Sequence, residues 1–396
     1  MCSIFGYTAK DIPMHILAEE FSKSKERGPD MTRMEETPSG VLGYHRLAIM
    51  GLDETGMQPF ALGADRLVCN GEIYAFRPLR DALAEKYEFR SGSDCEILLP
   101  LWREHGPEMF KMLDAEFALL LYDAERDRLI AARDPIGIRP LYYGYSESGH
   151  ILFSSEARCL VGLTSRVSPF PPGCWYDGER FVRYRDLTEV EAPVADDLDT
   201  VCENIRSLLI QGIVKRLDAD APVGFLLSGG LDSSLVCAVA ASVSEKPIRT
   251  FAIGMREDAI DLKYARQTAE YLKSDHTEVV VSPEDILAAV EPVIARLGTW
   301  DITTVRASIG MYLVCRYIHE HTDIRVLLTG EISDELFGYK YTDFAPSAEA
   351  FQQEAEKRLR ELHMYDVLRA DRCIADNALE ARVPFGDLAF VSYVMS

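Results

Sequence analysis

Gly224-Phe225-Leu226-Leu227-Ser228-Gly229-Gly230-Leu231-Asp232-Ser233-Ser234 joins an apolar run to a polar, glycine-rich turn. The apolar residues predict a short buried strand, and a helical pattern continues from Ser234 to Val243. Two glycines let the backbone turn sharply and approach a ligand closely. Serine hydroxyls and the unpaired amides of a helix start suit an anion. The stretch therefore predicts a strand, a turn and a helix that together cradle phosphate groups.

The carboxylate of Asp232 lies inside this predicted anion cradle, and it fits there only if a cation such as Mg²⁺ bridges it to the phosphates. The cradle is not of the Walker type, because no Gly-Lys-Ser/Thr follows it. A second acidic turn, Thr329 to Glu335, follows the apolar run Val326-Leu327-Leu328. If both runs are parallel strands, Asp232 and Asp334 face one cleft and share Mg²⁺. Acidic turns are also common helix caps, so the second turn leaves that alternative open.

Beyond residue 198, predicted strands alternate with predicted helices, which is typical of a parallel sheet with ligands at the strand ends. We expect strands over 223–227, 250–253, 278–281 and 325–328, and helices over 199–217, 234–243, 261–272, 284–297 and 306–321.

The first half has a different pattern, with short apolar strands separated by Gly, Pro and Asp turns. We expect strands at 67–69, 117–122 and 129–132 and helices near 14–24 and 94–105, which make an α+β layered domain of mostly antiparallel sheets. Residues 188–198 are acidic and contain a proline, so they predict a linker between a domain at 1–187 and one at 199–396.

The chain begins Met1-Cys2-Ser3-Ile4-Phe5-Gly6. If the initiator methionine is removed, the Cys2 thiol and a free α-amine share one residue. That amine has a reference pKa of about 8, so it can act as the base that activates its own thiol. The alternative is a cysteine that merely belongs to a buried first strand.

Composition restricts the possible functions. The 396 residues are 47% hydrophobic and 27% charged, which predicts a soluble protein with two full cores. A net charge of -22 argues against a nucleic-acid surface. No apolar run is long enough to span a membrane, and no secretory signal is present. Nine scattered cysteines without a CxxC predict reduced thiols and a cytoplasmic protein without a zinc site.

Several further motifs agree in order and spacing with one family. They are Arg27-Gly28-Pro29-Asp30, Arg46-Leu47-Ala48-Ile49, Asn70-Gly71-Glu72-Ile73-Tyr74, Gly92-Ser93-Asp94-Cys95-Glu96, Arg133-Asp134 with Pro140-Leu141-Tyr142-Tyr143, Thr303-Thr304-Val305-Arg306-Ala307-Ser308 and Glu380-Ala381-Arg382-Val383-Pro384-Phe385. With the Cys2 start and the Ser228 turn, they resemble glutamine-dependent asparagine synthetases, which are class II amidotransferases. The resemblance covers essentially all 396 residues.

The resemblance implies an N-terminal-nucleophile αββα sandwich followed by a parallel-sheet ATP pyrophosphatase domain. It implies that glutamine is hydrolysed at Cys2 and that the ammonia amidates an aspartyl adenylate made from ATP with Mg²⁺. It also implies a homodimer.

The resemblance also assigns roles to individual residues. In the first half it places an oxyanion hole at Asn70 and Gly71, and glutamine contacts at Arg46, Glu72 and Asp94. In the second half it implies ATP contacts at Leu226, Ser228, Gly229, Gly230, Asp232, Ser233, Ile253, Thr329 and Gly330. It assigns Glu331 to the adenylation step, Arg306 to aspartate and Asp232 with Asp334 to the metal.

Three features depart from the family pattern. Ile332 stands where the family usually has glycine, and a β-branched residue is poorly suited to a positive φ. Phe337-Gly338-Tyr339 carries one glycine where two are usual. Relatives continue for a further segment that holds a catalytic lysine, so we expect a C-terminally truncated synthetase half.

These departures keep two alternatives open. One is a glutaminase or regulatory remnant with an inactive synthetase half. The other is a related amidotransferase that acts on a different carboxylate.

Overall fold

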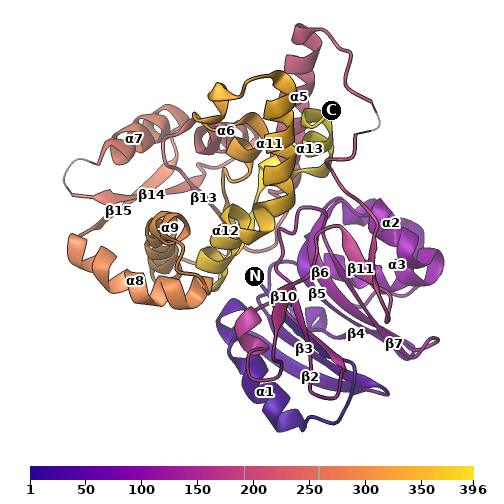
Figure 1. Ribbon diagram of the computed structural model, residues 1–396. Coiled ribbons are helices and arrows are strands. Elements are labelled where there is room, and N and C mark those ends of the chain that lie inside the picture. The colour runs from indigo at the N-terminus through magenta and orange to yellow at the C-terminus, as the bar shows by residue number, and fades with distance from the viewer. Residues whose placement is uncertain (191, 257–258) are drawn as a thin grey trace. The chain divides into compact units, whose positions relative to one another are not determined.

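The computed structural model describes residues 1–190, 192–256 and 259–396, and these form two compact units, Met1–Asp186 and Leu187–Ser396 (Figure 1). The first unit contains two six-stranded sheets whose strand pairs are antiparallel, and the second contains a five-stranded parallel sheet. Among the residues described, no helix combines the length and apolar character that crossing a membrane requires.

The first unit is a layered sandwich. One sheet has the order β10 (Val167–Pro169), β8 (Tyr142–Tyr145), β9 (Ile151–Ser154), β1 (Ser3–Tyr7), β3 (Gly40–Arg46) and β2 (Met31–Thr37). The other has the order β12 (Phe181–Arg183), β11 (Cys174–Tyr176), β7 (Arg128–Arg133), β6 (Ala115–Asp123), β5 (Asp65–Ile73) and β4 (Phe60–Leu62). The helices are α1 (Met14–Ser22), α2 (Phe76–Leu83), α3 (Leu98–His105) and α4 (Met109–Met112).

Alternate faces of the strands build the layers. Ile4, Val68 and Leu120 belong to one buried cluster, which fills the space between the two sheets. Their neighbours point the other way, and Phe5 packs with Leu17 of α1 on the outer face of the first sheet. This period of two is what a strand buried on both faces requires. The first unit is thus an αββα sandwich of the N-terminal-nucleophile type, as expected from the sequence.

The first unit contains the two expected helical regions and, beyond them, the helix α2. The helix expected near 14–24 is α1, and that near 94–105 is a 3₁₀ turn at Asp94–Ile97 followed by α3. The helix α2 was not predicted. It has a strongly charged outer face and buries only Phe76 and Leu83.

The second unit contains a twisted parallel sheet covered by helices. Its strand order is β15 (Asp275–Val281), β14 (Arg249–Met255), β13 (Val223–Leu226), β16 (Val326–Leu328) and β17 (Glu380–Arg382). Its helices are α5 (Leu198–Lys215), α6 (Leu231–Val243), α7 (Ile260–Leu272), α8 (Pro283–Leu297), α9 (Ile302–His321), α10 (Ser333–Phe337), α11 (Ala348–Glu361), α12 (Asp366–Ala375) and α13 (Leu388–Val394). The switch in strand order lies between β13 and β16, so the turns after these two strands lie at the position where such sheets bind ligands.

The edge strand β17 connects the last part of the second unit to its first helix. Arg382 is fully buried, and its Nη1 donates to the carbonyl oxygens of Arg216 at 3.0 Å and Asp218 at 2.7 Å, just after α5. Asp387 caps α13 and forms ion pairs with Lys215 and, at 3.1 Å, with Arg216. The motif from Glu380 to Phe385 is therefore part of the scaffold of this sheet.

Candidate active sites

The Cys2 thiol lies just before β1 and receives two hydrogen bonds. The Tyr44 hydroxyl donates to Sγ at 3.0 Å, and the Leu47 amide donates at 3.4 Å. Donors that converge on sulfur stabilise a thiolate, which is the nucleophilic form. Burial raises the pKa of Tyr44 far above its usual value, so this hydroxyl keeps its proton and remains a donor. Tyr44 was not predicted, because its place in the sequence indicates only an inward-facing residue of a strand.

The backbone of Cys2 is held by a buried ion pair. Arg27 Nε donates to the Cys2 carbonyl at 3.1 Å, while its Nη1 binds Glu156 at 2.9 Å. Both charged side chains are about 2% exposed or less. The Arg27 side chain must satisfy both the Glu156 carboxylate and the Cys2 carbonyl, which restricts its conformation. This contact fixes the backbone at the start of β1.

The predicted oxyanion hole lies on β5. The Asn70 side chain is 1% exposed, and its Nδ2 has no hydrogen-bond acceptor among the residues described. A buried amide donor without an acceptor costs free energy and calls for an explanation by function. Gly71 is required by packing, because a Cβ there would lie 2.6 Å from the carbonyl oxygen of Glu116 on β6.

The residues predicted to hold the glutamine carboxylate and ammonium lie on two loops in contact. Arg46 donates to the carbonyls of Gly51 and Asp53, and its Nη1 also donates to Met31 Sδ at 3.9 Å. A Cβ on Gly51 would lie 2.7 Å from the amide nitrogen of Ser93, so the Gly51 loop touches the turn that carries Asp94.

Asp94 is 3% exposed and accepts the Ile73 amide at 2.7 Å. The neighbouring acid, Glu72 of β5, is also buried. Asp94 is thus tied to β5, and the turn that carries it touches the Gly51 loop that Arg46 binds.

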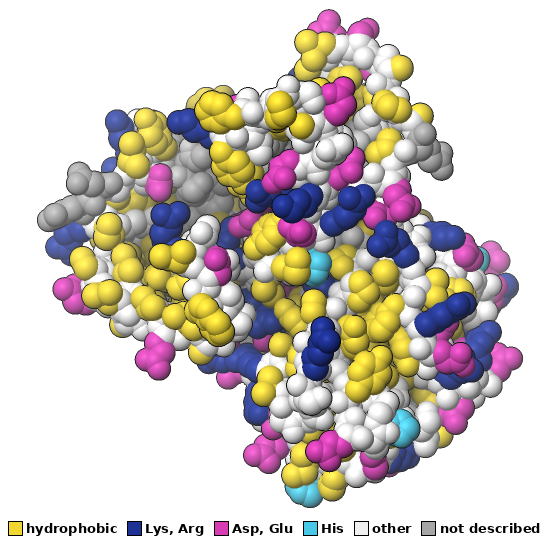
Figure 2. Space-filling model, viewed as in Figure 1, with side chains coloured by type: hydrophobic (Ala, Val, Ile, Leu, Met, Phe, Trp, Pro, Cys, Tyr) yellow, Lys and Arg dark blue, Asp and Glu magenta, His cyan; other side chains and the backbone are white. Residues whose placement is uncertain are grey.

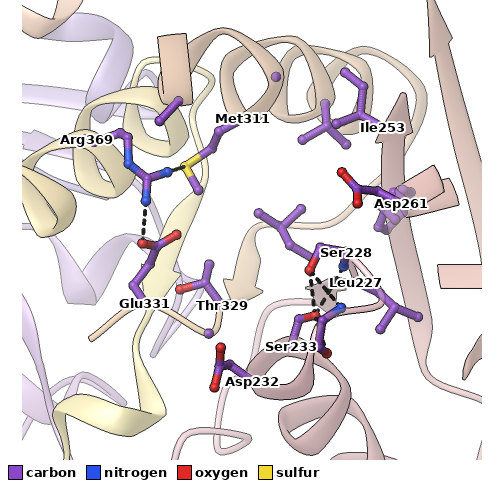
Figure 3. Close-up of a pocket in the computed structure, with 18 of the residues that line it drawn as sticks. Leu227, Ser228, Asp232, Ser233, Ile253, Asp261, Met311, Thr329, Glu331 and Arg369 are labelled. Carbon is purple, nitrogen blue, oxygen red and sulfur yellow. Dashed lines mark hydrogen bonds and ion pairs between the residues drawn. The ribbon is translucent and has the colours of Figure 1, made fainter. Parts of the chain in front are cut away.

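The second unit contains a cavity of about 410 Å³ at the carboxyl ends of its strands (Figure 3). Of the predicted ATP contacts, those that line the cavity are Leu226, Ser228, Gly230, Asp232, Ser233, Ile253, Thr329 and Gly330. Glu331 and Asp334 line it as well, so the structure brings the two polar turns together.

Gly229 and Arg306 are not among the lining residues. Gly229 has a φ of +80°, and a Cβ there would lie 2.5 Å from the backbone nitrogen of Ala265, so this glycine faces α7. Arg306 is exposed on the first turns of α9, close to the exposed Trp300 and Ile302. Figure 2 shows hydrophobic side chains gathered over α8 and α9. The roles of Gly229 and Arg306 remain predictions.

The two turns are in direct contact. The Ser333 hydroxyl donates to Asp232 Oδ1 at 2.6 Å, and a Cβ on Gly330 would lie 3.0 Å from Asp232 Cβ. Burial raises the pKa of Asp334, and so does the negative charge of nearby Asp232.

Among the residues described, no group of three or more His, Cys, Asp or Glu side chains could hold a metal. Two carboxylates suit Mg²⁺, which usually takes one or two carboxylates together with substrate phosphates and waters. The pair therefore fits a metal that arrives with a nucleotide.

Glu331 belongs to a charged network on the wall of the cavity. Arg369 of α12 donates to Glu331 Oε2 at 2.6 Å and to Asp366 Oδ1 at 3.3 Å (Figure 3). Burial raises the pKa of Glu331, and the Arg369 guanidinium opposes that rise. Arg369 was not predicted, because no local pattern distinguishes this arginine from others on the surface of a helix.

Ile332 keeps the backbone geometry that glycine would supply. Its φ is +83° and its ψ is -20°, and its side chain is 1% exposed. A β-branched residue in this conformation is strained, and such strain is typical of functional sites. Isoleucine therefore replaces the glycine that the family usually has here, and the turn stays at the cavity, since Glu331 and Asp334 both line the cavity.

Comparison with known proteins agrees with this geometry. The glutamine amidotransferase domain family matches residues 1–169, and the asparagine synthase family matches residues 204–349 and 343–396. The chain is 40% identical to an asparagine synthetase [glutamine-hydrolyzing] of Gallus gallus, over all of this chain and 77% of that one. It is 38% identical to the human asparagine synthetase, with 77% of that chain covered, and 36% identical to asparagine synthetase B of Escherichia coli, with 75% covered.

An N-terminal-nucleophile sandwich followed by a unit with a parallel sheet defines a class II glutamine amidotransferase with an ATP pyrophosphatase domain. The matches specify the class further. The chain belongs to the glutamine-hydrolysing asparagine synthetase family.

Proposed function

We propose that the protein converts aspartate to asparagine, with glutamine as the nitrogen donor and with ATP cleaved to AMP and pyrophosphate. The proposal rests most directly on one observation: the two polar turns, with Asp232, Glu331 and Asp334, line a single cavity at the strand ends. The intact cysteine site in the first unit supplies the second requirement, a source of ammonia.

In the first unit, removal of Met1 frees the α-amine of Cys2, which then takes the thiol proton. The thiolate attacks the side-chain amide of glutamine, the α-ammonium of Cys2 passes its proton to the departing nitrogen, and a thioester forms as ammonia leaves. Water then hydrolyses the thioester, which releases glutamate and restores the thiol. The buried Asn70 amide and the Gly71 N–H donate to the oxygen that becomes negative during the attack. We assign the α-carboxylate of glutamine to Arg46, and its α-ammonium to Glu72 and Asp94.

In the second unit, the adenosine lies against Leu226 and Ile253, with further contacts from Thr329 and Gly330. The Ser228, Gly229, Gly230 and Ser233 turn holds the phosphates. Asp232 and Asp334 would hold Mg²⁺, which would supply positive charge against the phosphates of the pyrophosphate leaving group. Glu331 acts in the adenylation step, and Arg306 meets aspartate.

Another part of the proposal rests on the resemblance. That part is the homodimer. The domain limits 1–187, 188–198 and 199–396 rest on the acidic, proline-containing linker, and the cytoplasmic location rests on the pattern of cysteines. None of the nine cysteines, all of which lie in the described part of the chain, forms a disulfide, which is consistent with a reducing compartment. Light scattering of the purified protein tests the dimer directly.

The test measures glutamate, asparagine and pyrophosphate after incubation with glutamine, aspartate, Mg²⁺ and ATP. We expect pyrophosphate only when aspartate is present, and asparagine in equal amount. Cys2→Ala abolishes glutamine use but spares synthesis from added ammonium. Cys202→Ala, which removes an exposed thiol outside the site, is the matched control. Glutamate without pyrophosphate identifies a glutaminase remnant, and loss of both activities in Cys2→Ala contradicts the division of labour.

A further inference from the structure

Asp261 is a carboxylate of the nucleotide cavity that the proposed mechanism does not use. It lies on the first turn of α7 and lines the cavity together with Ile253. Figure 3 shows its carboxylate directed into the cavity on the side of Ile253, away from Glu331 and Arg369. The cavity thus has an acidic group on the wall opposite Arg369.

The packing of α7 fixes the position of Asp261. At the end of β14, a Cβ on Gly254 would lie 2.7 Å from Leu262 Cγ, so only glycine lets the helix start this close to the strand. At the phosphate turn, the space beside Gly229 is filled by the backbone of Ala265, four residues after Asp261. Residues four apart share one face of a helix. Two glycine contacts therefore direct Asp261 toward the ligand.

Charge restricts what Asp261 can meet. Asp232 and Asp334 can share a cation with the phosphates, and Glu331 is paired with Arg369 at 2.6 Å. Asp261 makes no hydrogen bond or ion pair with its side chain within the described part of the chain. A carboxylate without a cation repels phosphate but accepts hydrogen bonds from neutral donors. ATP carries such donors on its nucleoside, namely the ribose hydroxyls and the 6-amino group.

We infer that Asp261 selects the nucleoside of the nucleotide substrate by accepting a hydrogen bond from one of these donors. The inference rests on the proposed use of ATP and names a specificity residue for it. The ordinary alternative is that Asp261 only stabilises the start of α7, because an acidic residue in the first turn interacts favourably with the helix dipole.

Calorimetric binding of Mg²⁺ with ATP, 2′-deoxy-ATP, 3′-deoxy-ATP or ITP separates these interpretations, since it needs no turnover. The full chain should bind at least one analogue roughly tenfold or more weakly than ATP, because a hydrogen bond to a charged group is lost. A deoxy analogue identifies the ribose as the source of the donor, and ITP identifies the base. In Asp261→Ala and Asp261→Asn, that ratio should fall to about one.

Glu270→Gln, on the same helix but outside the cavity, makes the same charge change and should keep the wild-type ratio. Preserved discrimination in Asp261→Ala, or equal binding of all four nucleotides by the wild type, overturns the inference. A wild-type protein that discriminates among nucleotides but makes no asparagine would refute the proposed function and leave the role of Asp261 intact. Thermal unfolding of each variant reports any change at the helix start separately.

Discussion

The Ser333 hydroxyl donates a hydrogen bond to Asp232 Oδ1 at 2.6 Å and thereby joins two turns that are 101 residues apart. Asp232 belongs to the phosphate cradle after β13, and Ser333 begins α10 after β16. The bond fixes one carboxylate oxygen, so the other keeps a constant direction toward the cavity.

Ser333→Ala should weaken the binding of MgATP. A hydrogen bond to a charged group contributes about 1.5–3 kcal/mol, and part of that loss should appear as a roughly tenfold higher KM for ATP. The KM for glutamine should not change. Ser242→Ala removes a hydroxyl from the exposed side of α6 and serves as the control. An unchanged KM for ATP would show that Asp232 is oriented without Ser333.

Asn70→Ala should lower glutamine-dependent synthesis by about 10²–10³, because loss of one oxyanion donor has that effect. Synthesis from ammonium chloride should remain at the wild-type rate. Asn70→Asp keeps the shape of the side chain but replaces the donor with an acceptor, and it should be at least as damaging. If either variant hydrolyses glutamine normally, the unpaired Nδ2 has another purpose.

Arg369→Gln should shift the pH dependence of asparagine formation toward higher pH. Burial raises the pKa of Glu331, and the guanidinium opposes that rise, so removing Arg369 leaves more Glu331 protonated near neutral pH. Raising the pH restores the carboxylate and with it part of the rate. Arg358→Gln, which loses a pair with Glu354 on α11, should keep the wild-type profile. A loss of rate that no pH reverses would indicate a different role.

The strained backbone of Ile332 predicts a difference in stability between two variants at this position. Ile332→Gly and Ile332→Ala remove the same buried side chain, but only alanine keeps the strain at a φ of +83°. The glycine variant should therefore be the more stable by about 1 kcal/mol or more in urea unfolding. The same pair at Leu287, an exposed position inside α8, should show the opposite order, because alanine is favoured in a helix by about 1 kcal/mol. Equal stability at position 332 would contradict the strain.

His45 should make the first unit sensitive to acid. Its ring stacks on Phe21 at 3.8 Å, and burial lowers its pKa from 6.5 to about 4. The folded state therefore binds the proton more weakly than the unfolded state. Its contribution to the free energy of unfolding is constant above about pH 6.5 and falls as the pH drops toward 4, by about 3 kcal/mol.

His45→Gln should be less stable at pH 7 but should lose less stability between pH 6.5 and pH 4. Urea unfolding followed by the fluorescence of the buried Trp102 and the nearby Trp175 reports on this unit. His15→Gln, at an exposed position, should retain the wild-type slope. An identical slope in His45→Gln would mean that the histidine is not buried as a neutral group.

Much of this architecture follows from local sequence patterns. The apolar run before Ser228 predicts β13, and the helical period after it predicts α6. Each pattern is contained within one short stretch of sequence, so no distant contact is needed to recognise it. The strand β17 could not be predicted in the same way. Glu380-Ala381-Arg382 contains two charged residues and becomes a strand only because β16 offers an edge and the carbonyls after α5 accept the Arg382 guanidinium.

The site shows the same limit. Asp232 and Asp334 lie in glycine-rich turns after strands, so the sequence indicated them. Arg369 and Asp261 lie on helices. The spacing of apolar residues shows which face of each helix is buried, but whether either charged residue lines the cavity depends on how the helices pack. Ile332 was recognised as unusual from the sequence, but only the backbone shows that the residue accepts the strained conformation.

The contact between Arg382 and the carbonyls after α5 has a consequence for synthesis in the cell. The strand that completes the second sheet lies far behind the first helix of that unit in the chain, yet Arg382 binds the carbonyl oxygen of Arg216, 166 residues earlier. The Val194 amide likewise donates to the carbonyl of Ser396 at 2.9 Å. A nascent chain still in the ribosome tunnel cannot close this unit, whereas the strands of the first unit have all emerged once residue 183 is free. Folding during translation should therefore occur in two separate stages.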